Sequence, residues 1–391
     1  MQYRIDQKTG KELSVLGFGC MRFPKNADTV DELIVQAVQQ GINYFDTAYI
    51  YPGNEEALGR VLEENNIREQ VYIATKLPLF LVRSQKDFDK FFDKELERLK
   101  TNYIDYYLMH MIATLSQWQA LCEMGIEKWI SDKKASGTIR QIGFSFHGPK
   151  DEFMAILDAY NWEFCQIQYN YSDENYQAGV AGLKKAASKD IPVIIMEPLL
   201  GGKLAAGLPK EAEVLLQNAN SDYSPAEWAL RWLWNQPEIT VVLSGMNEMS
   251  QLKENINAAN RMEIGALTDV EKETLEKVRE IFKTSNKIPC TGCGYCQPCP
   301  HHVNIPGCFS AYNNSFILGR FTGFQQYMQS TGALGKEECR ASLCVQCGLC
   351  EKHCPQEIKI SEELKIVKRK METWWYRFGI GAFRFFLGRN K

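Results

Sequence analysis

The sequence lacks the features that would place the chain in or across a membrane. No uninterrupted apolar run reaches the roughly 20 residues that a spanning helix needs. The opening residues, MQYRIDQKTGKEL, are polar and lack the apolar core of a signal peptide. We therefore expect a cytoplasmic protein.

The sequence also lacks an excess of charge of either sign. Lys and Arg number 45 against 48 Asp and Glu, which gives a formal net charge of -3 at pH 7. Nucleic-acid-binding proteins present a basic field to the phosphate backbone, so we expect no nucleic acid among the partners. The composition is that of an ordinary globular protein, and 391 residues predict one large domain plus a smaller one.

Cysteine, in contrast, is abundant and concentrated in one region. The chain has 13 cysteines, and ten of them lie between Cys290 and Cys354. Clustered cysteines in a reducing compartment more often bind metal or carry out redox chemistry than form disulfides. The concentration indicates a metal or redox site near the carboxyl end.

Short β-rich runs alternate with amphipathic segments from residue 13 to about residue 260, which is typical of βα units. In one helical pattern Leu33, Ile34, Ala37 and Val38 share a face, and Gly41 stands at the stop position. Eight repeats favour the α/β class and a (β/α)8 TIM barrel, with an open doubly wound sheet as the alternative. The eight strand candidates are residues 14–20, 42–48, 71–76, 104–110, 139–146, 164–170, 192–198 and 239–245.

Four polar residues stand at or just after the carboxyl ends of these strands, where barrels carry their chemistry. Asp46, Lys76 and His110 end the second, third and fourth strands, and Tyr51 follows Asp46 in the next loop. A Lys near a Tyr favours the phenolate, and an Asp keeps that amine charged. Tyr51 could then protonate a carbonyl oxygen that His110 orients. Taken singly, each residue also has a structural interpretation: a strand cap, a solvated charge or a core histidine.

The motifs DTAYIY, NEEALG, ATK and DYYLMH resemble the aldo-keto reductase family over residues 1 to about 280. The resemblance implies a catalytic tetrad of Asp46, Tyr51, Lys76 and His110, bound NADPH and a small-molecule carbonyl substrate. It also implies that Gln166 contacts the nicotinamide carboxamide and that Met196 or Glu197 stacks on the nicotinamide ring.

The chain departs from the family at two cofactor positions. The usual Ser-Asn pair after the fifth strand is replaced by Ser145-Phe146-His147. In the phosphate-binding stretch SGMNEMSQLKEN, Gln251 replaces the expected Arg, which removes the strongest contact to a 2'-phosphate. NADP, NAD and weak nicotinamide binding therefore all stay open. The residues that the resemblance assigns to this cofactor are Ser145, Gln166, Met196, Gly245, Gln251, Glu254 and Asn255.

The cysteines form two runs with the spacing of bacterial ferredoxins, each followed by proline. The crossed ligation of ferredoxins predicts two 4Fe-4S clusters. The shorter last gap of the first run leaves open that its four cysteines hold a single cluster, and zinc is the alternative metal. Outside the motif, Cys308 and Cys339 are interpreted as buried apolar thiols, with replacement of a ligand as the alternative. The remaining cysteines, Cys20, Cys122 and Cys165, are interpreted as small core residues. The predicted ligands are Cys290, Cys293, Cys296 and Cys354 for one cluster and Cys344, Cys347, Cys350 and Cys299 for the other.

Residues 1 to about 363 resemble a subgroup of aldo-keto reductases fused to a C-terminal ferredoxin-type domain, and the motifs MEPLLGGKLA and GFSFHG are similar to that subgroup. We predict an aldo-keto reductase-like barrel over 1–284, joined by the linker KTSNKIP to a small α+β ferredoxin-like or α-helical iron–sulfur domain over 285–363. A basic, aromatic tail follows over 364–391. The tail suits peripheral contact with an anionic membrane, or packing against the barrel or a second subunit.

Nicotinamide gives up electrons as hydride, whereas an iron–sulfur cluster moves one electron at a time. Three hypotheses follow: a reductase fed through the clusters by an external ferredoxin, a nicotinamide-dependent reductase with structural or oxygen-sensing clusters, and a non-catalytic electron-transfer or scaffold protein. We predict an oxidoreductase that reduces a carbonyl or activated double bond, and we leave its electron source open.

Overall fold

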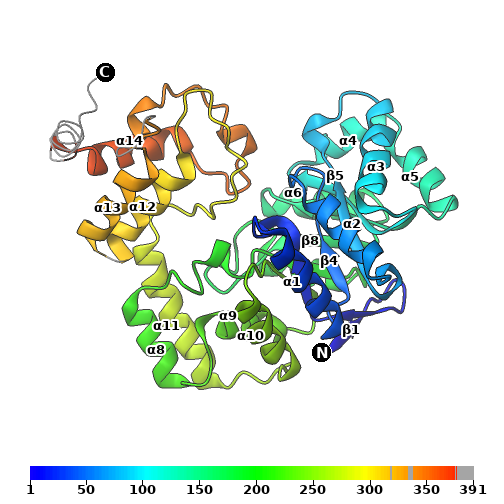
Figure 1. Cartoon of the computed structure of the whole chain (residues 1–391), viewed down its shortest axis with the longest axis horizontal. Coiled ribbons are helices and arrows are strands. Elements are labelled where there is room, and N and C mark those ends of the chain that lie inside the picture. Colours follow the sequence, from blue (N-terminus) through cyan, green and yellow to red (C-terminus); the bar gives the residue numbers. More distant parts are fainter. Residues whose placement is uncertain (318, 333–337, 375, 377–391) are drawn as a thin grey trace. The chain divides into compact units, whose positions relative to one another are not determined.

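The computed structural model describes residues 1–317, 319–332, 338–374 and 376. The chain forms two compact units, labelled by element in Figure 1. The first unit consists of Met1–Leu199 and Ala226–Asp269, and the second of Leu200–Pro225 and Val270–Lys391.

The first unit is a closed barrel of eight parallel strands, so the predicted (β/α)8 fold is confirmed. Neighbouring strands pair in chain order from β3 to β10, and β10 pairs with β3 to close the ring. Each strand falls at a predicted position. The strands are β3 (Leu16–Gly19), β4 (Tyr44–Asp46), β5 (Tyr72–Leu77), β6 (Ile104–Ile112), β7 (Ile139–Phe146), β8 (Phe164–Gln168), β9 (Val193–Met196) and β10 (Ile239–Ser244).

Helices surround this barrel and cover the outward face of the strands. Helix α1 shows why they form: Val30, Leu33, Ile34 and Ala37 are buried on one face, and the Asn26 side chain accepts a hydrogen bond from the Thr29 N–H at the start. The helices of this unit are α1 (Ala27–Gln39), α2 (Asn54–Glu64), α3 (Lys86–Leu99), α4 (Leu115–Glu123), α5 (Ile126–Ala135), α6 (Lys150–Ala159), α7 (Gly179–Ala187), α9 (Pro225–Trp234) and α10 (Met249–Asn260).

Alternation along the strands creates a separate core inside the barrel. Side chains at every second position point inward and pack together, while their neighbours face the helices. The inner core contains Leu13, Tyr44, Ala74, Tyr106, Leu108, Phe164, Ile194, Val241 and Leu243.

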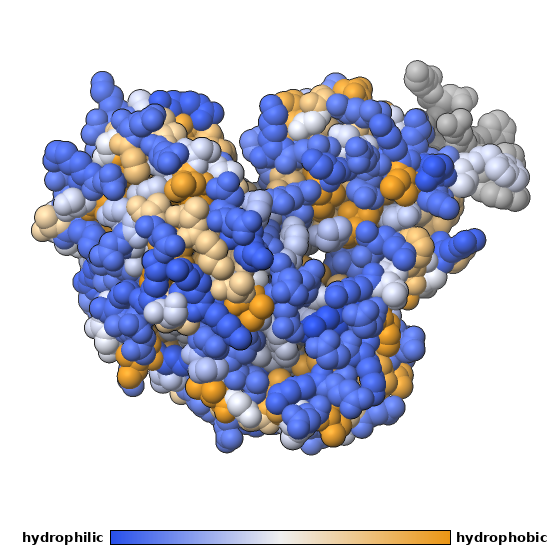
Figure 2. All heavy atoms as spheres, turned by 180° about the vertical axis from the view of Figure 1, so that it is seen from behind, coloured by the Kyte–Doolittle hydropathy of each residue, from blue (hydrophilic) through white to orange (hydrophobic). Residues whose placement is uncertain are grey.

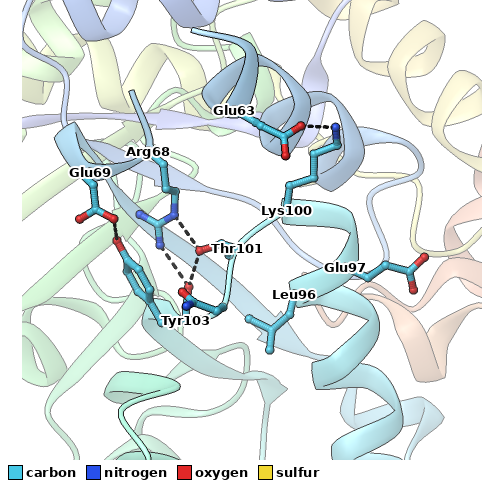
Figure 3. Close-up of a pocket in the computed structure, with 9 residues that line it drawn as sticks. Glu63, Arg68, Glu69, Leu96, Glu97, Lys100, Thr101 and Tyr103 are labelled. Carbon is cyan, nitrogen blue, oxygen red and sulfur yellow. Dashed lines mark hydrogen bonds and ion pairs between the residues drawn. The ribbon is translucent and has the colours of Figure 1, made fainter. Parts of the chain in front are cut away.

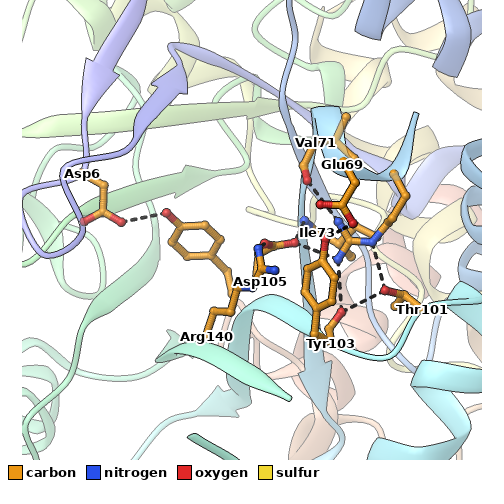
Figure 4. Close-up of polar contacts among 10 residues, drawn as sticks. Asp6, Glu69, Val71, Ile73, Thr101, Tyr103, Asp105 and Arg140 are labelled. Carbon is orange, nitrogen blue, oxygen red and sulfur yellow. Dashed lines mark hydrogen bonds and ion pairs between the residues drawn. The ribbon is translucent and has the colours of Figure 1, made fainter. Parts of the chain in front are cut away.

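A hairpin that the sequence patterns did not reveal closes the amino-terminal end of the barrel. Strands β1 (Tyr3–Ile5) and β2 (Glu12–Ser14) pair antiparallel, and the turn between them carries Asp6, which accepts a hydrogen bond from the Tyr106 hydroxyl at 2.7 Å. Asp105 nearby accepts hydrogen bonds from Arg68 and Arg140 (Figure 4). These contacts occupy the end of the barrel opposite Asp46 and Lys76.

The second unit is helical, and its described residues form no strand. Helix α12 lies against α13 and α14, and a small core that includes Phe309, Tyr327 and Val367 forms among them. The α-helical form of the predicted iron–sulfur domain is therefore the one observed. Its helices are α8 (Lys210–Ala219), α11 (Asp269–Ser285), α12 (Ile305–Ile317), α13 (Arg320–Ser330) and α14 (Ile360–Met371).

Parts of the segments predicted as a linker and as a tail are packed into this core. Ile288, in the predicted linker, is fully buried. Leu364 and Met371 on α14, at the start of the predicted tail, are buried with Tyr376. Trp375 and residues 377–391 lie outside the described residues, so membrane contact through the tail stays a prediction. No helix among the described residues is long and apolar enough to cross a membrane, and Figure 2 shows scattered hydrophobic patches on a mainly hydrophilic face.

Candidate functional site

The carboxyl end of the barrel carries a layer of polar side chains directly above the inner core. Asp46, Lys76, His110, Gln166 and Met196 each stand two residues beyond an inner-core residue of the same strand, so they face inward. All but Met196 are at most 5% exposed. The strand geometry therefore brings these predicted residues to one mouth.

Asp46 and Lys76 form a buried ion pair between neighbouring strands. The Lys76 Nζ donates to Asp46 Oδ1 at 2.7 Å and to the Thr47 carbonyl oxygen at 2.6 Å. Gln166 donates from Nε2 to the other carboxylate oxygen at 2.9 Å. A buried pair with these additional hydrogen bonds holds the ammonium in one place.

Tyr51 lies beside this pair and beside His110. The Lys76 Nζ is 5.5 Å from the centroid of the Tyr51 ring. The rings of Tyr51 and His110 meet edge to face, with centroids 6.3 Å apart. The four residues that the sequence suggested as catalytic are thus gathered around one point of the barrel mouth.

A buried network anchors the loop that carries Tyr51. Arg98 on α3 donates to the Tyr49 carbonyl oxygen at 3.0 Å and to Glu55 Oε2 at 3.1 Å. Glu55, at the start of α2, also accepts from the Thr75 hydroxyl at 2.6 Å. Since Thr75 precedes Lys76 on β5, the network ties the Tyr51 loop to the strand that supplies the lysine.

The surroundings of His110 favour its neutral imidazole form. Burial, followed by the nearby Lys76 ammonium and by His147, holds its pKa well below the usual value. The pairing register of β6 and β7 shifts between Met109 and Ile112, the interval that contains His110. Such irregularities are common beside active sites. A neutral imidazole can donate a hydrogen bond without adding a second positive charge next to Lys76.

Two of the predicted nicotinamide residues retain hydrogen-bonding capacity. Gln166 uses its amide nitrogen on Asp46, while its buried Oε1 has no partner within the described structure. The Ser145 hydroxyl accepts from the Met111 N–H at 2.8 Å, so its own proton can still be donated. An exposed carboxamide edge would satisfy both groups, which fits a nicotinamide at this mouth.

The predicted phosphate-binding residues lie around the first turns of α10, and two of them form hydrogen bonds within the protein. Gln251 accepts from the Asn247 N–H at 3.0 Å, and Asn255 donates to the Ser244 hydroxyl at 3.0 Å. Glu254 is half-buried on the same helix, and Gly245 follows β10 beside Gly19. The helix offers free N–H groups to a phosphate but places no guanidinium from position 251 there.

A large surface hollow lies elsewhere and is not part of this site. Arg68, Glu97, Lys100 and Tyr103 are among its lining residues (Figure 3). These residues precede β5 and β6, at the amino-terminal end of the barrel, where residues usually serve stability instead of catalysis.

The second unit contains a cavity lined by four cysteines from both runs. Cys290, Cys293 and Cys296 line one cavity together with Cys354, and Phe309 and other apolar residues complete its wall. Burial, and then the other three thiols, raise the pKa of Cys296 to about 12. This is the set that crossed ligation predicts for one cluster, and an apolar cavity with four thiols fits a 4Fe-4S group.

Cysteines of the second run lie near Cys299, as predicted for the second cluster. Burial, then Cys344, Glu351 and Cys299, raise the pKa of Cys350 to about 11, so thiols from both runs again act on each other. Cys347, the fourth predicted ligand, is exposed.

The two cysteine loops repeat one backbone pattern. The second residue after the leading cysteine has positive φ in both loops, at Gly292 (70°) and Gln346 (61°). The residue after the next cysteine does too, at Gly294 (84°) and Gly348 (71°). Alternating backbone of this kind turns N–H groups inward to form a concave anion site, and the Gln346 N–H lies 3.4 Å from Cys344 Sγ.

Two residues beside these sites were not singled out from the sequence. His147 continues the inward alternation of β7, is 8% exposed and acts on His110. Lys203, in the turn region after β9, lies beside Cys290. A histidine two positions beyond Ser145 and a lysine within the small-residue motif LLGGKLA were the available signals.

Comparison with known proteins gives matches to both parts of the chain. The model of the Aldo/keto reductase family matches residues 15–280, and that of a 4Fe-4S dicluster domain matches residues 289–359. L-galactose dehydrogenase of Arabidopsis thaliana is 29% identical over 317 residues, covering 72% of this chain and 95% of that protein. L-glyceraldehyde 3-phosphate reductase of Escherichia coli (strain K12) is 24% identical over 311 residues, covering 67% and 88%.

A solved structure supports the fold as well. An aldo-keto reductase from Bacillus halodurans, in its holo form, has a TM-score of 0.60 and 24% identity and covers 71% of this chain and 96% of its own. At this identity the match supports the shared barrel and nothing finer.

Proposed function

The chain belongs to the aldo/keto reductase family, and on that premise we propose that this oxidoreductase reduces the carbonyl group of a small molecule with Tyr51 as general acid. The observation that carries the proposal is the grouping of Tyr51 with the Asp46–Lys76 pair and His110 at the barrel mouth. Carbonyl reduction needs a hydride at carbon and a proton at oxygen, and this group is suited to supply the proton.

Each residue has a defined part in that proton transfer. The Tyr51 hydroxyl gives its proton to the carbonyl oxygen, and the Lys76 ammonium stabilises the phenolate that remains. Asp46 and the Thr47 carbonyl oxygen keep the ammonium in place. Neutral His110 donates a hydrogen bond to the same oxygen and orients the substrate.

A nicotinamide cofactor, NAD or NADP, would supply the hydride when bound. Gln166 and Ser145 would hold its carboxamide, and Met196 would pack on the ring. The residues near the phosphates would be Gly245, Gln251, Glu254 and Asn255. Because Gln251 offers no positive charge, we expect at most a weak preference for NADPH over NADH.

We further propose two 4Fe-4S clusters, one on Cys290, Cys293, Cys296 and Cys354 and one on Cys344, Cys347, Cys350 and Cys299. The match to a 4Fe-4S dicluster domain supports iron–sulfur binding, and the four-cysteine cavity supports the first set. The clusters would exchange single electrons with an external carrier such as a ferredoxin. The division into residues 1–284, 285–363 and 364–391 is likewise proposed.

Replacement of Tyr51 by phenylalanine tests the proposal. Tyr51→Phe removes the proton donor but keeps the ring, so we expect kcat for carbonyl reduction to fall by roughly 10²- to 10⁴-fold, with nicotinamide affinity retained. The substrate panel should begin with small aldehydes such as L-glyceraldehyde 3-phosphate, the compound named in one of the relatives.

Tyr49→Phe is the matched control, because it makes the same chemical change two residues away on the same loop. Its turnover should stay close to that of the unmodified protein. Undiminished turnover in Tyr51→Phe would refute the assigned acid, whereas equal losses in both variants would point to a general disturbance of the loop.

A further inference from the structure

The turn that follows β9 packs backbone to backbone against the first cysteine loop. Gly201 has φ of 70°, and a Cβ at this position would lie 2.2 Å from the Thr291 carbonyl oxygen. Only glycine allows this approach. Thr291 is 4% exposed and directly follows Cys290, so the turn is held against the start of the four-cysteine cavity.

Lys203, two residues after Gly201, is fixed by a chain of hydrogen bonds. Its Nζ donates to Asn286 Oδ1 at 2.8 Å, and that oxygen also accepts from Asn313 Nδ2 at 2.8 Å. Asn313 in turn accepts from the Ile288 N–H at 2.9 Å and donates to the Ile288 carbonyl oxygen at 2.7 Å. The chain joins the ammonium to the segment that leads into Cys290.

The environment of Lys203 is unusual for a lysine. Burial lowers the pKa of its ammonium to about 8, and the Cys290 thiolate opposes this shift. Among the described residues its hydrogen-bond partner is the amide of Asn286, and no carboxylate acts on its pKa. A cation without a carboxylate partner that is partly removed from water and interacts electrostatically with Cys290 responds strongly to any negative charge that the cysteines hold.

We propose that Lys203 is a positioning residue that raises the reduction potential of the cluster held by Cys290, Cys293, Cys296 and Cys354. The inference rests on the cluster assigned under the proposed function. Reduction adds one electron to the cluster, and a nearby half-buried cation stabilises the added charge. No proton transfer is required, because the lysine acts by its charge alone.

The second cysteine loop provides a contrasting lysine. Lys352 stands between Cys350 and Cys354 in the chain but is exposed to water. Solvent and salt screen exposed charges, so its effect on either cluster should be much smaller than that of Lys203.

The test is a potentiometric titration of the anaerobically purified full chain, followed by electron paramagnetic resonance at pH 7. In Lys203→Met we expect one of two reduction steps to move to more negative potential, with a roughly tenfold smaller equilibrium constant for reduction, which is 59 mV for one electron. Lys203→Arg should restore the step. Lys352→Met should leave both steps close to their original positions.

Iron content separates the possible failures. If wild type and Lys203→Met both carry full iron but titrate identically, the role of Lys203 is refuted and the clusters stand. If Lys203→Met alone loses iron, Lys203→Gln, whose amide can keep the bond to Asn286, replaces it as the neutral variant, and unchanged potentials there refute the inference. An equal shift in Lys352→Met would also refute it. A wild-type chain without iron would refute the proposed clusters themselves and this inference with them.

Discussion

At the scale of a single residue, the burial of His147 makes the stability of the barrel depend on pH. Burial lowers its pKa to about 4, compared with about 6.5 in an unfolded chain. Protonation therefore favours the unfolded state. The stability that depends on neutral His147 is present above pH 6.5 and is lost as the pH falls toward 4.

We predict that His147→Asn makes the barrel less sensitive to acid. Between pH 7 and pH 5 the wild type should lose about 2 kcal/mol of unfolding free energy more than the variant does. Denaturant unfolding followed by circular dichroism at the two pH values measures this difference. His301→Asn, which removes an exposed histidine, should follow the wild type, and parallel pH dependence in all three proteins would contradict the prediction.

The sequence revealed some functional candidates at this scale and not others. Asp46, Tyr51, Lys76 and His110 could be named because each is a polar residue at or just beyond the end of an apolar strand. Lys203 could not be recognised in this way, since the role proposed for it depends on Asn286 and Cys290, which are more than 80 positions away in the chain and approach only after folding.

At the scale of elements, the two cysteine loops share a backbone pattern, and in the proposed ligation each loop supplies one thiol to the cluster of the other. The cavity that joins Cys354 to the first run supports this exchange. Sequence spacing alone left open that the first run holds one cluster by itself.

Two double variants distinguish these arrangements by iron content. Cys299→Ala with Cys344→Ala removes two ligands of one cluster if ligation is crossed, so about four of roughly eight irons should remain. Cys354→Ala with Cys344→Ala removes one ligand from each cluster, so iron should fall toward zero. Iron and sulfide analysis after anaerobic purification gives the counts, and the reverse result would establish uncrossed ligation.

The long strands and helices were predictable because their periodicity is strong. The eight barrel strands and α1 match the sequence patterns closely. The β1–β2 hairpin was missed because each strand has three residues, which is too short to show alternation, and because its role depends on Leu13 entering the barrel.

At the scale of the whole molecule, the proposed function combines an active site that uses hydride with clusters that carry single electrons. We predict that NADH and NADPH, added anaerobically without a mediator, leave the cluster absorbance unchanged on the time scale of carbonyl turnover. Hydride cannot be delivered to a one-electron acceptor without a group that separates the two electrons.

Stopped-flow absorbance with cluster-loaded protein measures this directly, and dithionite reduction of the same sample is the positive control. Rapid bleaching by a nicotinamide alone would contradict the prediction and would favour electron passage between the barrel site and the clusters.

Each of the two units is built from two separate stretches of the chain, so a single boundary in the sequence cannot divide them. Leu200–Pro225 belongs to the second unit although residues before and after it belong to the first. A boundary drawn along the sequence assigns each segment by its neighbours, whereas the turn at Gly201 is assigned by its packing on Thr291.

The meeting of Cys354 with residues 290–296 has a consequence for biosynthesis. A ribosome emits the three earlier thiols well before the fourth, so a growing polypeptide would present an incomplete ligand set to the cell's iron delivery machinery. If ligation is crossed, metal loading has to wait until translation is nearly complete. A truncated chain that ends before residue 354 would lack one of the four ligands of the first cluster.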